Sequence, residues 1–456
     1  MKSGEIMSLR VFCILSAALF FSTAVRAETI FDAMSNAYNS NPTLHGERAQ
    51  SGVSNEEAAA ARSGFRPVVG ASANYTDSHN RTTGRNTVDG YSKGYRGYVT
   101  QPIFNGFKTY NSVKAADNAA KAELENLYAV EQQVLLAAST AYLDVVRDEA
   151  IVKLQKNNEK LLKKQLDETL ARFEVGEVTR TDVAQSRASY AQARSDVISA
   201  EGLLEISKAN YLDITGKEAG SVQFPEHLSQ LFPQDLNNAK TYAFRNNYTL
   251  KAAKKALKAA KYNVTAQKGG LLPEVSFTAT SGKNTISSHT ARDPSTRSNE
   301  YTVNMSVPLY SGGATRAEIR KSKYKRWAAQ EQLRAAESGV ETGVTNGWAL
   351  MQTSKSNIEA IKEQIKASAI ALEGTQKEEM LGNRTVLDVL NAYQTLLASQ
   401  VNEVTARHDY YVSGLQLLQA MGKLTAEKLG LKVNPYDARG HYQNTKGKWL
   451  SLSIDK

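Results

Sequence analysis

The chain has 456 residues, of which 41% are hydrophobic, 22% are charged, nine are proline and one is cysteine. This composition excludes collagen-like, disulfide-stapled and low-complexity proteins, and a mean hydropathy of −0.43 disfavours a helical membrane protein. The formal net charge of +10 is compatible by itself with a nucleic-acid or anionic-surface partner, an interpretation that the rest of the sequence weakens.

Residues 1–27 have the pattern of a signal peptide. Basic residues precede an apolar run at 11–21, and a cleavage site with small residues ends at Ala27. Cleavage would remove Cys13, the sole cysteine, which has no lipobox before it, so we expect an exported chain without thiols or a lipid anchor. No later apolar run approaches the ~20 residues of a spanning helix, so a membrane crossing would have to use strands.

The rest of the sequence is a tandem duplication with one constant offset, because residues of the first half recur 206 positions later without a gap. The matching pairs are Pro67 and Pro273, Pro102 and Pro308, Gly106 and Gly312, Gly176 and Gly382, Asp182 and Asp388, and Gly216 and Gly422. We therefore predict a first structural repeat at 28–216, a linker at 217–236, a second repeat at 237–422 and a C-terminal tail at 423–456.

Each repeat is predicted to contain a short helix, two strands joined by a polar loop, and two long helices joined by a glycine turn. The stretch 107–175 lacks glycine and proline, and a helix of that length would extend roughly 100 Å at 1.5 Å per residue. Its counterpart at 314–381 carries Gly339, Gly343 and Gly347 on one face. These glycines indicate either a locally weakened helix or the close approach of a neighbouring helix.

The strand pairs, about 68–103 and 274–309, alternate apolar and polar residues and have the length of tilted transmembrane strands. Gln101 interrupts the apolar face of the first pair. The connecting segments, 77–94 and 282–300, are polar and are expected to be loops in water. Four strands cannot close around a lumen, so further copies of the chain would have to complete it; two hairpins on a soluble domain are the alternative.

Motifs for catalysis or cofactor binding are absent from the sequence. The six histidines lack metal-ligand spacing, and no phosphate-binding loop, dinucleotide-binding turn or nucleophile elbow occurs. We therefore expect no enzyme activity, no cofactor and no metal. Nucleic-acid binding lacks an aromatic or fold signature and conflicts with the export signal.

Two turn segments, 173–183 and 381–390, share one pattern. Their glycines fit the left-handed position that ends a helix, and the Thr-x-x-Asp sequences that follow fit the start of the next helix. Acids at 182 and 388 are also favoured there by the helix dipole. This structural role accounts for both aspartates and leaves a functional role open.

The signal peptide, the duplicated layout, the proline junctions and the two turn segments together resemble the TolC family over essentially the whole mature chain. The resemblance implies a mixed α and β membrane protein, a homotrimer whose twelve strands form one transmembrane β-barrel in the outer membrane of a Gram-negative cell. A long α-helical coiled-coil barrel would continue it across the periplasm.

The same resemblance implies a passive exit duct. A periplasmic adaptor (membrane fusion protein) and an inner-membrane pump of the RND or ABC type would complete it, for multidrug efflux or type I secretion of proteins. Outer-membrane lipid and exported drugs or proteins would be its other partners. The alternative function is a periplasmic coiled-coil adaptor or structural protein without a membrane barrel.

Carried over by motif, the resemblance implies a gate at the periplasmic end. Asp182, Arg384 and Asp388 match family gate positions. Asn391 stands where a second acid often completes a double ring, and Glu379 stands where a tyrosine often forms part of the tether. Glu379 could instead pair with an arginine such as Arg384.

In a homotrimer, Asp388 would recur as a ring of carboxylates that favours cations, and repulsion within the ring would raise the carboxyl pKa. The resemblance also implies that the adaptor meets the helical tips at Val175, Gly176, Leu381 and Gly382.

Overall fold

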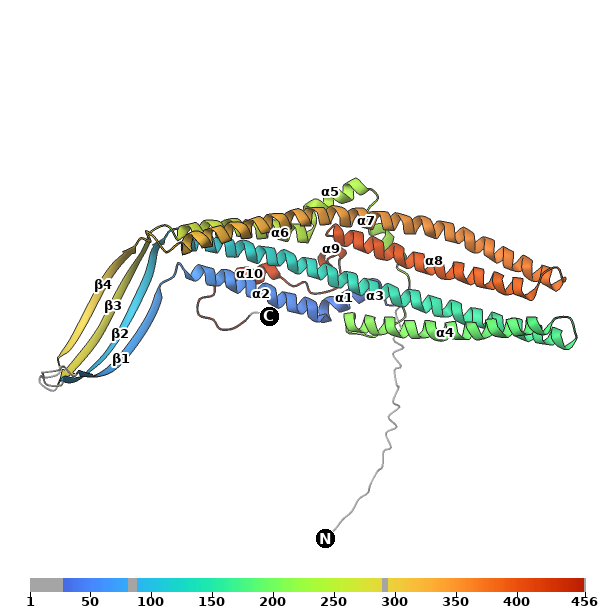
Figure 1. Ribbon diagram of the computed structural model, residues 1–456, viewed down its shortest axis with the longest axis horizontal. Coiled ribbons are helices and arrows are strands. Elements are labelled where there is room, and N and C mark those ends of the chain that lie inside the picture. Colours follow the sequence, from blue (N-terminus) through green and yellow to red (C-terminus); the bar gives the residue numbers. More distant parts are fainter. Residues whose placement is uncertain (1–27, 81–87, 289–293, 455–456) are drawn as a thin grey trace, which may run out of the picture.

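The computed structural model describes residues 28–80, 88–288 and 294–454. The molecule is elongated, with one four-stranded sheet projecting from the end of a long helical body (Figure 1). The predicted mixed α and β class is confirmed. The predicted signal peptide at 1–27 and the tips of both strand connections lie outside the described residues.

The helices of the second half start 206 residues after those of the first half. The first half contains α1 (Ile30–Ser40), α2 (Pro42–Ser63), β1 (Val68–Asn80), β2 (Val88–Asn105), α3 (Lys108–Glu174) and α4 (Arg180–Thr215). The segment between the halves holds one 3-10 helix, η1 (Glu226–Leu231). The second half contains α5 (Leu236–Asn246), α6 (Tyr248–Gly269), β3 (Glu274–Ser288), β4 (Ser295–Ser306), α7 (Ala314–Met380) and α8 (Val386–Ala420), followed by α9 (Ala426–Leu429) and α10 (Ala438–Lys446).

Each half opens with two helices where one short helix was predicted. Asn41 separates α1 from α2 and Asn247 separates α5 from α6, both with extended backbone. Their side chains cap the following helices by accepting hydrogen bonds from backbone N–H groups, including that of Leu250 in the second half. In the first half, Pro42 also disfavours a helical conformation at the residue before it.

The two very long helices agree with prediction to within one residue at each end, and each has 67 residues. Figure 1 shows α3 and α7 running the length of the helical body, with α4 and α8 folded back along them. A Cβ placed on Gly347 would lie 3.2 Å from the Cα of Leu417 in α8, whereas one on Gly339 meets no atom of the described residues within 4 Å. The close-approach interpretation therefore holds at Gly347 and not at Gly339.

Among the helices of the described residues, none combines the length and the apolar character that a membrane crossing requires.

The sheet has the antiparallel order β1-β2-β3-β4 and two unlike faces. One row across all four strands is mostly apolar, consisting of Val69, Val99, Ala279 and Tyr301. The adjacent row on the opposite face is mostly polar and consists of Val68, Thr100, Thr278 and Thr302. Tyr301 is 75% exposed, and no helix covers either face in Figure 1.

Gln101 does lie in an apolar row, as predicted, beside Phe277. Its amide nitrogen turns to the backbone, where it donates to the carbonyl oxygens of Phe65 and Pro102. A bulge between Pro102 and Phe104 shifts the register of β2 against β3, and the pairing continues to Asn105 and Glu274.

The prediction of long loops at 77–94 and 282–300 was wrong. The β1–β2 ladder continues to the pair Asn80 and Val88, and the β3–β4 ladder continues to Thr285 and Ser295. The apolar alternation stops earlier than the pairing because backbone hydrogen bonds need no apolar side chains in water. β4 also ends at Ser306, earlier than predicted, because Pro308 lacks the N–H that would extend the ladder.

The segment between the halves packs against the helical body. Leu228 of η1 is buried, and the hydroxyl of Tyr142 in α3 donates to the backbone carbonyls of Glu28 and Gln223. Tyr211 of α4 donates to the Glu28 carboxylate at 2.6 Å. The chain between the repeats is therefore part of the central core.

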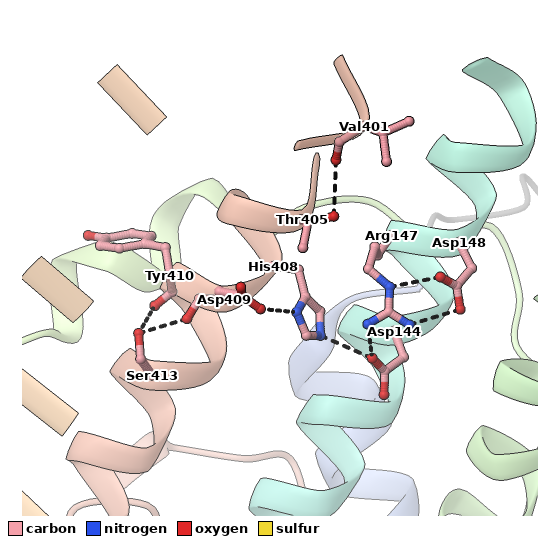
Figure 2. A network of polar contacts seen from close by, with 9 residues as sticks. All are labelled: Asp144, Arg147, Asp148, Val401, Thr405, His408, Asp409, Tyr410 and Ser413. Atoms are coloured by element: carbon pink, nitrogen blue, oxygen red, sulfur yellow. Dashed lines mark hydrogen bonds and ion pairs between the residues drawn. The ribbon is translucent and has the colours of Figure 1, made fainter. Parts of the chain in front are cut away.

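A polar cluster joins the two halves at mid-length, between α3 and α8 (Figure 2). The buried imidazole of His408 bonds through Nδ1 to Asp409 at 2.9 Å, and its Nε2 lies 3.0 Å from Asp144 as an ion pair. Arg147 bridges Asp144, at 2.8 Å, and Asp148. Both nitrogens of His408 face carboxylates, so the imidazolium form fits the site.

Burial lowers the pKa of His408, but the contacts with Asp144 and Asp409 outweigh burial and leave the pKa above its ordinary value of 6.5. Because the pKa is raised in the folded protein, the stabilisation is fully present below pH 6.5 and is lost as the pH rises through the raised value.

We expect His408→Gln to lower the melting temperature by about 2–4 °C at pH 6 and by less at pH 8.5, because the charged form stabilises the fold only at the lower pH. Circular dichroism of the purified protein over this pH range measures the effect. His227→Gln, at an exposed histidine, serves as the control. A difference between wild type and His408→Gln that does not change with pH would contradict the expectation.

Candidate functional site

The end of the helical body far from the sheet consists of two hairpin turns, α3–α4 and α7–α8 (Figure 1). At the first turn, the N–H of Glu177 donates to the carbonyl of Arg172 and that of Gly176 donates to Phe173. Gly176 has φ 81° and Gly382 has φ 77°, the left-handed conformation that the sequence predicted. The second turn repeats the same pair of bonds.

Both aspartates of the turn segments take part in capping boxes, as predicted. The backbone N–H of Asp182 donates to Thr179 Oγ1, while the Asp182 carboxylate accepts from the Thr179 N–H at 2.8 Å. Thr385 and Asp388 repeat this arrangement at 3.2 and 3.0 Å. Each carboxylate is thus bonded within its own hairpin.

The hydrogen bonds from the backbone and side chain of Thr385, together with the nearby charge of Arg384, lower the pKa of Asp388. A ring of such carboxylates would act in the opposite direction, since like charges disfavour ionisation. A single protomer therefore presents Asp388 as an ionised carboxylate at neutral pH.

Glu379 and Arg384, which the sequence suggested as partners, do not pair with each other. Arg384 Nε donates to Glu378 at 2.9 Å, with both side chains about half exposed. Glu379 instead accepts from Arg172 Nη1 of α3, and its side chain is only 8% exposed. The pairing differs because Glu379 turns inward from the last turn of α7, toward the first hairpin.

Arg172 is the residue that sequence reasoning missed. Its Nε also lies 3.2 Å from Glu177, so one guanidinium joins the first turn to the second hairpin. The hydrogen bond to Glu379 raises the pKa of Arg172, which stays charged. The signal available in the sequence was an arginine one turn before Gly176, but the sequence alone does not show which acid it meets.

A small apolar cluster lies among the four helices above the tips. Its buried members are Leu162, Ala193, Leu372, Val386, Val389, Leu390 and Tyr393. It is separate from the larger core at mid-length, so the tips are held together mainly by this cluster and by the Arg172 pair.

The outermost residues of both turns are exposed. Val175 is 72% and Leu381 is 77% exposed, and Gly176 and Gly382 each have open space where a side chain would start. Asn391 is exposed on α8, one turn beyond Asp388. Within residues 28–80, 88–288 and 294–454, no group of three His, Cys, Asp or Glu residues is arranged to hold a metal ion.

Comparisons with known proteins agree with this architecture. The sequence model of the family described as outer membrane efflux protein matches residues 33–217 and 242–423. Outer membrane efflux protein BepC of Brucella suis is 34% identical over 96% of this chain and 95% of its own length. Outer membrane protein TolC of Escherichia coli is 26% identical over 90% of this chain and 85% of its own length.

The fold is also found among solved structures. The outer membrane channel CmeC of Campylobacter jejuni has a TM-score of 0.77 at 14% sequence identity, covering 92% of this chain and 89% of that chain. The two matched segments of the family model together span most of the chain, and BepC matches over nearly its whole length. The chain therefore belongs to the outer membrane efflux protein family and is an exit duct of the outer membrane.

Proposed function

We propose that three copies of this chain form a passive duct that drugs or other small molecules leave through, and that the helical tips close it at rest. The observation that carries the proposal is the sheet, which has an apolar row on one face, a polar row on the other and no helix over either. Three such sheets supply twelve strands, enough to close a water-filled barrel. The energy that drives export would come from a separate pump, since a passive duct supplies none.

Efflux is favoured over protein secretion as the main task, because the relative with 34% identity bears the name of an efflux protein. An adaptor and an inner-membrane pump are the proposed partners, and outer-membrane lipid would surround the strands. Because the chain belongs to this family, we reject the alternative function of a periplasmic adaptor or structural protein.

The proposed gate consists of two layers of charge. Arg172 and Glu379 hold the first hairpin to the second within a protomer, while Arg384, Asp388, Asp182 and the neutral Asn391 lie nearer the outer surface. Opening would separate the hairpins without breaking the turns, because the bonds of each capping box lie within one hairpin.

Single-channel recording in planar bilayers tests the duct. Purified, detergent-extracted protein should give a small conductance that prefers cations. A chain that stays in solution without detergent and carries no current would overturn the proposal.

Asp388→Asn should reduce the cation-to-anion permeability ratio several-fold and weaken block by multivalent cations, because it removes one charge from each protomer. Reversal potentials in a salt gradient measure the ratio. Asp32→Asn, in the equivalent capping box of α1, changes the same kind of cap far from the tips and serves as the control. Equal selectivity in wild type and Asp388→Asn would refute a role for the ring.

Glu379→Gln should increase the ratio of open to closed channels by roughly 5- to 30-fold for each protomer that opens, because it removes from each protomer an ion pair worth about 1–2 kcal/mol that ties the hairpins. The double variant Arg172→Glu with Glu379→Arg should restore closure. Open probability in bilayers is the measurement. Lys377→Gln removes an exposed pair with Glu373 within α7 and should leave gating unchanged. Similar gating in Glu379→Gln and Lys377→Gln would show that the tie is unimportant.

Gly176→Trp and Gly382→Trp should abolish pump-dependent export, because a large side chain would project from each proposed adaptor contact. Dye efflux from cells that carry the variant measures export, and bilayer conductance shows whether the channel still forms. Gly176→Ala and Gly382→Ala introduce the same backbone strain without the bulk and should retain most export. Unimpaired efflux in the tryptophan variants would contradict the assignment of the turns.

A further inference from the structure

The face of the sheet that carries the apolar row also carries Lys93 of β2, Lys283 of β3 and Arg297 of β4. Each lies an even number of positions from the residue of its own strand in that row, so the alternation of side chains places all three on one face. In the ladder, Lys283 is directly opposite Arg297, and Lys93 is opposite Thr285, the second residue after Lys283. Lys93 is therefore a diagonal neighbour of Lys283, at about 7–8 Å. We call these three residues the basic patch.

The charges of the basic patch are not compensated within the described part of the chain. There, the side chains of Lys283 and Arg297 are exposed and form no ion pair or hydrogen bond. Asp77 of β1 is a diagonal neighbour of Lys93, but its carboxylate lies 3.9 Å from Nε2 of His79. Like charges directly opposite each other on adjacent strands destabilise a sheet. An anion between Lys283 and Arg297 would remove this repulsion.

Tyrosines surround the basic patch at the same level of the sheet. Tyr95 is directly opposite Lys283 and Tyr75 is directly opposite Lys93, and the two tyrosines are 64% and 67% exposed. Tyr91 stacks on Tyr75 with 5.9 Å between the ring centroids, and Lys93 Nζ lies 5.6 Å from the centroid of Tyr91. Tyrosines gather where a transmembrane strand passes from hydrocarbon to head groups, so the patch lies at such a boundary.

The height of the patch places it at the boundary on the side away from the helical body, towards the free end of the sheet in Figure 1. The first apolar row at the base of the sheet consists of Phe104, Val275 and Met305. Arg297 follows eight positions from Met305 along β4, which is about 26 Å along the strand and roughly 20 Å across a membrane at a strand tilt of about 40°. The apolar band of an outer-membrane barrel is about 25 Å tall, so long basic side chains reach the head groups of the outer leaflet from here.

We propose that the basic patch binds the phosphate groups of a phosphorylated glycolipid, the lipopolysaccharide of the outer leaflet. One phosphate lies between Lys283 and Arg297 and cancels their repulsion, and Lys93 supplies a third charge-assisted contact. A head group with several phosphates fits cations from three strands better than the single phosphate of a glycerophospholipid does. The inference rests on the proposed function, because it requires the strands to span the membrane.

Native mass spectrometry of the full chain in detergent tests the site. Delipidated protein is titrated with lipid A that carries both phosphates, with dephosphorylated lipid A and with phosphatidylglycerol. We expect the phosphorylated lipid A to bind about tenfold or more tightly than either of the others, because only it offers several anionic groups. The triple variant Lys93→Gln, Lys283→Gln and Arg297→Gln should lose this advantage.

The matched control is Arg96→Gln, on the opposite face of β2. Arg96 Nε donates to Ser72 Oγ at 3.1 Å, so this cation has a partner within the sheet. Arg96→Gln should bind phosphorylated lipid A as wild type does. Equal affinity of wild type and the triple variant would overturn the site. Equal binding of phosphorylated and dephosphorylated lipid A would do so too, and equal binding of phosphatidylglycerol would overturn the assignment to a glycolipid.

A single charge reversal tests the site even if the triple variant fails to fold. Arg297→Glu turns the like pair with Lys283 into an opposite pair, so the lipid-free variant should melt no lower than wild type. Phosphorylated lipid A should raise the melting temperature of wild type, because a ligand that binds only the folded protein stabilises it, but should not raise that of Arg297→Glu. An equal rise in both proteins would overturn the site.

Channel current in planar bilayers distinguishes this failure from failure of the proposed function. Current from protein whose binding of phosphorylated lipid A does not depend on the basic patch would reject the lipid site and leave the duct intact. Protein that stays in solution without detergent and carries no current would overturn both.

Discussion

The unpaired edges of the sheet are the constraint from which the rest of the architecture follows. β1 pairs with β2 alone and β4 pairs with β3 alone, so each chain has two strand edges with free backbone donors and acceptors. In hydrocarbon, every such group costs several kcal/mol unless another strand satisfies it. The apolar row through Val69 and Tyr301 cannot stay in water either. Joining β4 of one copy to β1 of the next satisfies both requirements at once.

Closure of the sheet in turn determines what the helices must do. Each copy delivers two hairpins below its four strands, and these hairpins come from two halves with the same offset of 206 residues. In a closed trimer, the equivalent helices of the two halves would alternate around a ring. The halves are joined by contacts that are specific to one position, such as Gly347 against Leu417 and the cluster around His408. The two halves therefore share one backbone arrangement but differ in their side-chain contacts.

Features set by local rules could be predicted from the sequence, and features set by distant partners could not. The left-handed Gly176 and Gly382 and both capping boxes depend on residues within a few positions, and they were found as expected. The pairing of Glu379 with Arg172 and the cluster around His408 join helices from different halves, and spacing in the sequence does not contain that information. The lengths of the strands were underestimated because the backbone pairing extends beyond the residues in which apolar and polar side chains alternate.

In the proposed gate the two hairpins would move as units, because the bonds inside each turn are separate from the bonds that tie the hairpins together. Each turn is closed by its own glycine and capping box, so a hairpin keeps its shape when it swings. The ties between hairpins are few: one largely buried pair at Glu379, and the apolar cluster of which Leu390 is part. An exposed pair such as Arg384 with Glu378 contributes little, because water screens both charges. In the proposed gate, a docking partner would have to break the Arg172–Glu379 pair and open the apolar cluster, while the large core at mid-length stays intact as the pivot.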